Sequence, residues 1–244
     1  MSQPKFSIII PTLNEEKLLP KLLEQFNDED LRKEFNFEII ISDGGSKDNT
    51  LKVAEKFGTK IISSNGNNEN IARGRNRGAE DAESDYLIFL NGDVRVSNVR
   101  QLFTLIEIEF QNKQTLAITC PVKVFPEETK FIDRVFQTFY NNYFHLLNII
   151  AVGMGRGECH IIRKEIFNNV GGYNETLAAG EDFDLYKRIR KLGGIVFTRK
   201  FEIYESPRRY RKYGHFTIFF RWLLNSIFVI IMKKSLSKEW EQVR

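Results

Sequence analysis

The sequence contains little cysteine, which limits how the chain can be held together. Its 244 residues include two cysteines, Cys120 and Cys159, and these are not spaced as a Cys-x-x-Cys pair. Two cysteines at this separation are too few for a disulfide framework. We therefore expect a reduced, cytoplasmic setting. With 42% hydrophobic residues, the chain can bury a sizeable core and is not expected to be disordered.

Long apolar runs are also scarce. The first run, Phe6–Ile10, is too short for the apolar part of a signal peptide, so we expect no secretory leader. A later run, Phe216–Met232, is interrupted by Arg221 and Asn225 and falls short of the roughly 20 apolar residues of a membrane-spanning helix. Because Lys and Arg flank it, we predict an interfacial amphipathic helix. Packing on the core or on a second subunit of a homo-oligomer is the alternative.

Neither sign of charge is in large excess, but the positive charge is unevenly placed. The 36 Lys and Arg residues exceed the 32 Asp and Glu residues by four. Basic residues gather late in the chain, in "RKFEIYESPRRYRKYGH". This bias suits phosphate groups or an anionic membrane surface, and we expect no nucleic-acid partner.

Strand and helix patterns alternate through the first half. Apolar runs typical of buried strands read "FSIII", "FEIIIS", "KIISS" and "YLIFL", and helix-like stretches separate them. Continuous apolar strands separated by helices predict an α/β fold, with a mostly parallel sheet covered by helices on both faces. There is no internal repeat or low-complexity tract. We predict one domain over residues 1–205 and an appendage over residues 206–244, formed by the basic segment and the C-terminal helix.

Three polar motifs follow three of the predicted strands. They are "PTLNEE", "DGGSKDNT" and "NGDV". Each alone is explained by turn formation, because Asp, Asn and Gly favour turns. A parallel sheet would nevertheless bring all three to the edge where such folds bind ligands. The sequence therefore predicts a ligand site at the carboxyl ends of these strands.

The ordered set of motifs resembles family 2 glycosyltransferases, which have the GT-A fold. The resemblance rests on "SIIIPTLNEE", "EIIISDGGSKDNT", "ARGRNRGA", "YLIFLNGDV", "VGGYNE" and "GEDFDLYKRIRKLG". It spans roughly residues 5 to 200, and the set is specific although no single motif is. The family implies inverting transfer of a sugar from a nucleotide-diphosphate sugar of the UDP or GDP type, with Mg²⁺ or Mn²⁺ as cofactor.

The resemblance assigns the metal and the base. Asp93, the last residue of "NGD", would bind the metal, while Asn91 and Gly92 would contact the nucleotide-sugar; Asn91 stands where the family has the first Asp of Asp-x-Asp. One or two carboxylates suffice for a hard cation that also binds phosphates. Asp182 would be the catalytic base, with Glu181 orienting the acceptor or supporting a loop. The helix dipole also explains acids at this position.

Further site residues follow from the same motifs. Besides "NGD", the expected nucleotide-sugar-binding residues are Pro11, Thr12, Asn14, Glu15, Asp43, Gly45, Arg75, Arg208 and Arg209. The two late arginines would clamp the diphosphate or bind lipid headgroups. Gly172 and Tyr173 would shape the acceptor side, although core packing is as good an explanation for Tyr173. His215 is a candidate second metal ligand.

We therefore predict a metal-dependent, inverting glycosyltransferase acting at or near the cytoplasmic membrane face. Its acceptor would be a hydroxyl or phosphate, with a lipid-linked or polyprenyl acceptor if the C-terminal helix lies on a membrane. One alternative is a non-catalytic, membrane-associated nucleotide-sugar-binding module, which only Asn91 favours. The other is a sugar-phosphate nucleotidyltransferase. Those enzymes carry a glycine-rich phosphate loop after the first strand, and "PTLNEE" has no glycine.

Overall fold

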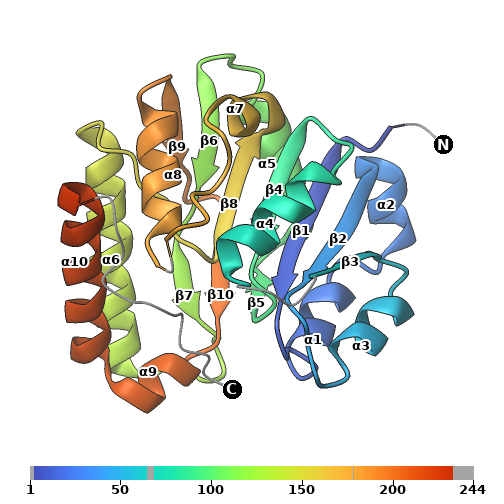
Figure 1. Ribbon diagram of the computed structural model, residues 1–244, viewed down its shortest axis with the longest axis horizontal. Coiled ribbons are helices and arrows are strands. Elements are labelled where there is room, and N and C mark those ends of the chain that lie inside the picture. The colour runs from blue at the N-terminus through green and yellow to red at the C-terminus, as the bar shows by residue number, and fades with distance from the viewer. Residues whose placement is uncertain (1–2, 65–68, 178, 233–244) are drawn as a thin grey trace.

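The fold is a three-layer α/β arrangement around a seven-stranded sheet (Figure 1). The structure is a computed structural model that describes residues 3–64, 69–177 and 179–232. The strands lie in the order β3-β2-β1-β4-β8-β6-β9. Their bounds are β1 Phe6–Thr12, β2 Phe37–Asp43, β3 Lys60–Ser63, β4 Tyr86–Leu90, β6 Thr115–Thr119, β8 Cys159–Arg163 and β9 Gly194–Phe197. β8 runs antiparallel to both neighbours and the other pairs are parallel, so the predicted mostly parallel sheet is confirmed.

Helices cover both faces of this sheet because its strands are apolar on both sides. Ile8 and Ile10 of β1 face one core, whereas Ile9 between them faces the other. The first core is completed by α1 Leu19–Glu24, α2 Glu29–Phe35, α3 Thr50–Lys56 and α5 Val99–Glu109. The second is completed by α4 Ile71–Glu80, α7 Lys164–Asn169 and α8 Glu181–Arg190. Near β1, α4 approaches closely through Gly78, where a Cβ would lie 2.4 Å from Ile9 Cγ2.

A second, three-stranded sheet was not foreseen from the sequence. It has the order β5-β10-β7, formed by β5 Val94–Val96, β7 Val122–Val124 and β10 Ile203–Glu205. Such short strands leave too few residues for a period-two pattern to be recognised. Because β5 directly follows the "NGD" turn and β10 precedes the basic segment, this sheet brings residues 91–94 and 203–208 together.

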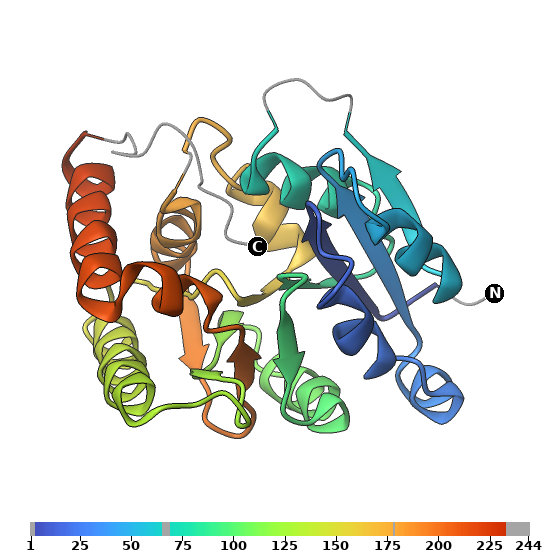
Figure 2. The same cartoon turned by 90° about the horizontal axis from the view of Figure 1, so that it is seen from below.

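The C-terminal part packs against the rest of the fold. It consists of α9 Arg208–Tyr213 and α10 His215–Met232, and α10 lies beside α6 Phe131–Ile149 (Figures 1 and 2). Phe219 and Trp222 of α10 join the cluster around Tyr140 and Phe144 of α6. Among the described helices, none combines the length and the hydropathy needed to cross a bilayer.

Candidate active site

A cavity of about 910 Å³ lies beyond the carboxyl ends of β1, β2 and β4. One side is polar and is formed by the predicted motifs. The other side is aromatic and is formed by α6 and α10, through Phe139, Tyr140, Tyr143, Phe144, Phe219 and Trp222. The predicted residues that line it are Pro11, Thr12, Glu15, Arg75, Asn91, Gly92, Asp93, Glu181, Asp182, Arg208 and Arg209.

The turns after β1 and β2 are locked together by hydrogen bonds. The Asp43 carboxylate is buried and accepts hydrogen bonds from Thr12 Oγ1, from the backbone N–H groups of Gly45 and Ser46 and from Ser46 Oγ. Asn14, at a positive φ of 57°, accepts a hydrogen bond from the Lys47 N–H. Asn14, Asp43 and Gly45 are not among the residues that line the cavity, so in this structure they shape the turns that place Pro11 and Thr12 there.

The "NGD" turn at the end of β4 is held by ion pairs that no sequence motif indicates. One Arg208 nitrogen, Nη2, lies 2.8 Å from Glu15 Oε1 and 2.8 Å from Asp93 Oδ2. Two carboxylate oxygens therefore converge on a single cationic position. Gly92 is buried against Glu15, where a Cβ would lie 3.2 Å from Glu15 Cγ, so a larger residue would have to displace the Glu15 side chain by a few tenths of an ångström.

Arg75 connects three of the predicted motifs. Its side chain is 1% exposed and donates hydrogen bonds to Glu181 Oε1 (2.8 Å), Asn91 Oδ1 (3.0 Å) and the carbonyl oxygen of Gly157 (2.6 Å). A buried guanidinium requires such partners to offset its desolvation. Asn91 therefore accepts a hydrogen bond from Arg75 here, and Arg75 links the motifs around Asn91, Gly157 and Glu181 at the wall of the cavity.

The two acids at the start of α8 have different environments. Glu181 is buried and paired with Arg75. Asp182 is half-buried and lines the cavity. Burial, followed by the charge of Glu181, raises the pKa of Asp182 to about 7. A carboxyl group with a pKa near neutrality is suited to act as a general base.

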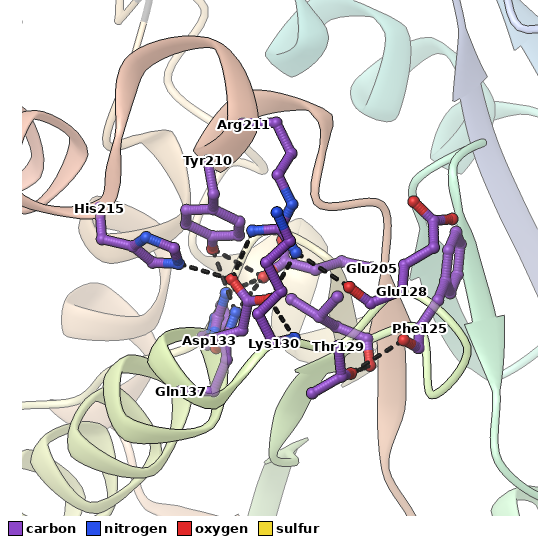
Figure 3. A network of polar contacts seen from close by, with 12 residues as sticks. Phe125, Glu128, Thr129, Lys130, Asp133, Gln137, Glu205, Tyr210, Arg211 and His215 are labelled. Atoms are coloured by element: carbon purple, nitrogen blue, oxygen red, sulfur yellow. Dashed lines mark hydrogen bonds and ion pairs between the residues drawn. The ribbon is translucent and has the colours of Figure 1, made fainter.

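A second buried arginine cluster lies in the same cavity and was not found from the sequence. Arg156 is 4% exposed and contacts Glu158 through Nε and Nη2, both at 3.2 Å. It also contacts Glu205 Oε1 at 3.1 Å and Gln137 Oε1 at 2.6 Å. Tyr210 donates a hydrogen bond to the same Glu205 oxygen, as Figure 3 shows. The acids in "GRGECH" and "YESP", each next to an apolar strand, are the only sequence signal.

The two acids of this cluster have opposite pKa shifts. Burial and the charge of Glu158 raise the pKa of Glu205 to about 8. Burial also disfavours the ionised form of Glu158, but the positive charge of Arg156 outweighs burial, so the pKa of Glu158 is lowered. One carboxylate thus balances the single arginine while the other acid is protonated at neutral pH.

Besides Asn14, Asp43 and Gly45, three further predicted site residues lie away from the cavity lining. His215 stacks on Tyr210 and its Nε2 lies 2.7 Å from Asp133 Oδ1, in the network of Figure 3. His215 is therefore paired with Asp133 and does not line the cavity that Asp93 lines. Gly172 and Tyr173 lie outside the main cavity. Tyr173 is 2% exposed and its hydroxyl lies 2.6 Å from His160 Nδ1, so it is a core residue here, as the packing alternative had it.

The chain belongs to glycosyl transferase family 2, whose family model matches residues 7–171. Named relatives are glycosyltransferases, which confirms the prediction of a transferase enzyme. The PGL/p-HBAD biosynthesis glycosyltransferase of Mycobacterium bovis is 25% identical over 75% of this chain and 69% of its own length. The 4,4'-diaponeurosporenoate glycosyltransferase of Staphylococcus haemolyticus is 37% identical over 41% of this chain. That match spans 27% of the relative's own length.

Solved structures confirm the GT-A fold. The mannosyltransferase PcManGT of Pyrobaculum calidifontis, solved with GDP-Man and Mn²⁺, matches with a TM-score of 0.67 and 16% identity, over 84% of this chain and 58% of that one. TarS of S. aureus matches with a TM-score of 0.62 and 19% identity, over 85% of this chain and 38% of TarS. At these identities the likeness concerns the fold alone.

Proposed function

We propose that this chain transfers a sugar from a nucleotide-diphosphate sugar to an acceptor with inversion at the anomeric carbon. The acceptor hydroxyl gives its proton to Asp182 as its oxygen attacks the anomeric carbon. The bond between that carbon and the phosphate oxygen breaks, and the nucleoside diphosphate leaves. The observation that carries the proposal is one cavity lined by both Asp182, whose pKa is about 7, and Asp93.

The donor set around Asp93 suits a divalent cation. Glu15 and Asp93 already direct two oxygens at one cationic nitrogen of Arg208, and Mg²⁺ and Mn²⁺ favour oxygen ligands. Within residues 3–64, 69–177 and 179–232 no group of three or more acidic, His or Cys side chains is placed to hold a metal, so phosphate oxygens would complete the set. Such an ion would stabilise charge on the departing diphosphate.

The two late arginines suit the phosphates. Arg208 and Arg209 both line the cavity from the start of α9. A planar guanidinium can bind phosphate through two parallel hydrogen bonds. Arg208 would exchange Asp93 for the diphosphate when the nucleotide binds, which keeps its charge paired in both states.

We propose an amphiphilic, lipid-linked acceptor because the cavity is aromatic on the side of α6 and α10. The same two helices carry most of the large apolar side chains that are exposed among the described residues. On and next to α6 these are Phe131, Ile132, Val135, Phe139, Tyr143, Leu146, Ile149 and Ile150, and on α10 they are Phe216, Phe220 and Leu224. Exposed apolar patches of this kind mark interaction surfaces.

We propose that this surface binds the cytoplasmic face of an anionic membrane. Exposed basic side chains border the apolar residues, namely Lys130, Arg134, Lys212 and Arg221. A mixed apolar and basic surface binds headgroups and the acyl boundary together. The acceptor would then enter the aromatic side of the cavity from the membrane.

Nucleotide binding tests the donor half of the proposal. Thermal unfolding is measured with UDP, GDP and CDP, with and without Mn²⁺, on wild type, Asp93→Ala and the exposed control Asp85→Ala. One nucleotide at about a hundredfold excess over its Kd should stabilise wild type and the control by about 2.7 kcal/mol in a metal-dependent manner. Asp93→Ala should lose the metal-dependent part. No stabilisation by any nucleotide would refute donor binding.

Vesicle co-sedimentation tests the membrane half. We expect binding to vesicles containing phosphatidylglycerol and little binding to pure phosphatidylcholine. Replacing Phe131, Phe216 and Phe220 together by Ser should abolish binding, whereas Ile108→Ser, an exposed apolar residue on α5, should not. Sedimentation velocity distinguishes the alternative: a wild-type dimer that the triple variant converts to monomer, without vesicle binding, would assign the surface to a second copy.

A further inference from the structure

We propose that Glu158 binds hydroxyl groups of the donor sugar and thereby helps to select it. This inference rests on the proposed function, because it assigns a residue to the sugar between the phosphates and the acceptor. It concerns a half-buried carboxylate that the transfer chemistry itself does not use.

The position of residues 157 and 158 supports this role. The Glu158 carbonyl oxygen accepts a hydrogen bond from the Asn91 N–H (3.4 Å), beside the "NGD" turn. On the other side, a Cβ on Gly157 would lie 3.3 Å from Asp182 Oδ2. In the proposed function the sugar lies between phosphates at Asp93 and a base at Asp182, and residues 157 and 158 lie between the turn that carries Asp93 and the Asp182 side chain.

The chemistry of the Glu158 carboxylate also suits a hydroxyl. Its two oxygens are held by Arg156 at 3.2 Å each, which fixes the orientation of the group. An ionised carboxylate has about four acceptor positions. Arg156 takes two of them, and Glu205 and the Glu158 N–H also hydrogen-bond the group, so a sugar hydroxyl would replace one of these two other donors. The side chain is 15% exposed and lines the cavity, so the carboxylate can be reached from the cavity. Hydrogen bonds to a charged acceptor discriminate strongly between analogues that have or lack the donor.

The stoichiometry of the cluster makes the proposal testable. Two acids, Glu158 and Glu205, share one arginine, Arg156. If Glu158 becomes Gln, Glu205 remains to ionise against Arg156, and if Glu205 becomes Gln, Glu158 remains. Each variant therefore keeps a balanced ion pair. They differ in whether the residue opposite the sugar is charged.

The experiment is titration calorimetry with Mn²⁺ present, using UDP and GDP and then UDP-glucose, UDP-GlcNAc and GDP-mannose. The measured quantity is the ratio of the Kd of the nucleoside diphosphate to that of its best sugar derivative. We expect Glu158→Gln to lower this ratio about tenfold and to leave the Kd of the free diphosphate within about twofold of wild type. The matched control Glu205→Gln should retain the wild-type ratio.

Three results would overturn the inference. Glu158→Gln could retain the ratio, or lose affinity for diphosphate and sugar derivative equally, which is the result of a structural role. Wild type could bind the diphosphate with no gain from any of the three sugars, which would leave nucleotide binding intact. If wild type bound no nucleotide, the proposed function would fail first. Should Glu158→Gln unfold, Glu158→Asp keeps the charge, and its shorter side chain should lower the ratio while retaining diphosphate binding.

Discussion

Two buried arginines, Arg75 and Arg156, line the same cavity, and they differ in how many carboxylates they contact. Arg75 donates to one carboxylate, Glu181, together with an amide and a backbone carbonyl. Arg156 contacts two carboxylates, Glu158 and Glu205. The first cluster is balanced as it stands, whereas the second is balanced only if one acid is protonated.

Each cluster contains one acid with a raised pKa, and the two acids differ in whether they are hydrogen-bonded to the arginine. Beside Arg75 it is Asp182, which is not hydrogen-bonded to the arginine and faces the cavity, with a pKa of about 7. Beside Arg156 it is Glu205, with a pKa of about 8, which is held by Gln137, Tyr210 and Arg156. The Arg75 cluster thus presents a proton acceptor, and the Arg156 cluster presents a fixed carboxylate.

The largest expected effect is on catalysis at the Arg75 cluster. Asp182→Asn keeps the size of the side chain but removes the proton acceptor. Transfer, or hydrolysis of the donor, should fall by about 10²- to 10⁴-fold, with donor Kd within about threefold of wild type. Measuring kcat and Kd separately checks this, and an active Asp182→Asn enzyme would show that the base lies elsewhere.

Removing the Arg75 charge should have the next largest effect, and on stability. Arg75→Met leaves the buried Glu181 without its partner, which costs about 3–5 kcal/mol for a broken buried pair. Urea denaturation measures the loss. Arg73→Met is the matched control, because Arg73 on the same helix pairs with Glu175 at the surface, at 40% side-chain exposure. If both variants lost the same free energy of unfolding, the buried Arg75 pair would contribute no more than the exposed Arg73 pair, and the prediction would be wrong.

The pH dependence of activity distinguishes Asp182 from an ordinary carboxylate. The base must be ionised, so kcat should fall about tenfold per pH unit below a midpoint near 7. A surface aspartate would place that midpoint near 4. A profile that stays flat down to pH 5 would mean that Asp182 does not have a raised pKa in the substrate complex.

Glu205 should make stability depend on pH in the opposite sense to most carboxylates. Its pKa is about 8 when folded against 4.5 for the ordinary group, so between these values the folded state binds the extra proton. The free energy of unfolding therefore falls as pH rises from 4.5 to 8. In Glu205→Gln this contribution, on the order of a few kcal/mol, should be absent. Urea denaturation at pH 5, 6.5 and 8 measures it, and identical slopes would contradict the shift.

A third arginine, Arg208, is only partly buried. Its substitution should therefore have the smallest effect of these variants. It pairs with Asp93 and Glu15, where the proposed cation would lie. Arg208→Gln should raise the affinity for Mn²⁺ alone several-fold and weaken nucleoside diphosphate binding about tenfold. Calorimetry of each ligand separately checks the opposite signs. Weaker binding of both ligands would mean that Arg208 only supports the fold.

The sequence determined the α/β sheet and most of the polar side of the cavity. The apolar runs of β1, β2 and β4 were visible because buried parallel strands have no polar alternation, and each ends in a polar turn. Sheet geometry then places those turns at one edge. For this reason Thr12, Asn91 and Asp93 could be expected near one another before any coordinates were known.

Only the tertiary structure decided how the charged side chains are paired. Arg75 with Glu181, Arg156 with Glu205 and Arg208 with Asp93 join residues 49 to 115 positions apart, and no local pattern encodes such pairs. The same holds for His215, whose partner is Asp133, and for the short sheet β5-β10-β7. The pKa of a carboxyl group depends on burial and neighbouring charge, so the proposed division of roles between Asp182 and Glu158 rests on the folded chain.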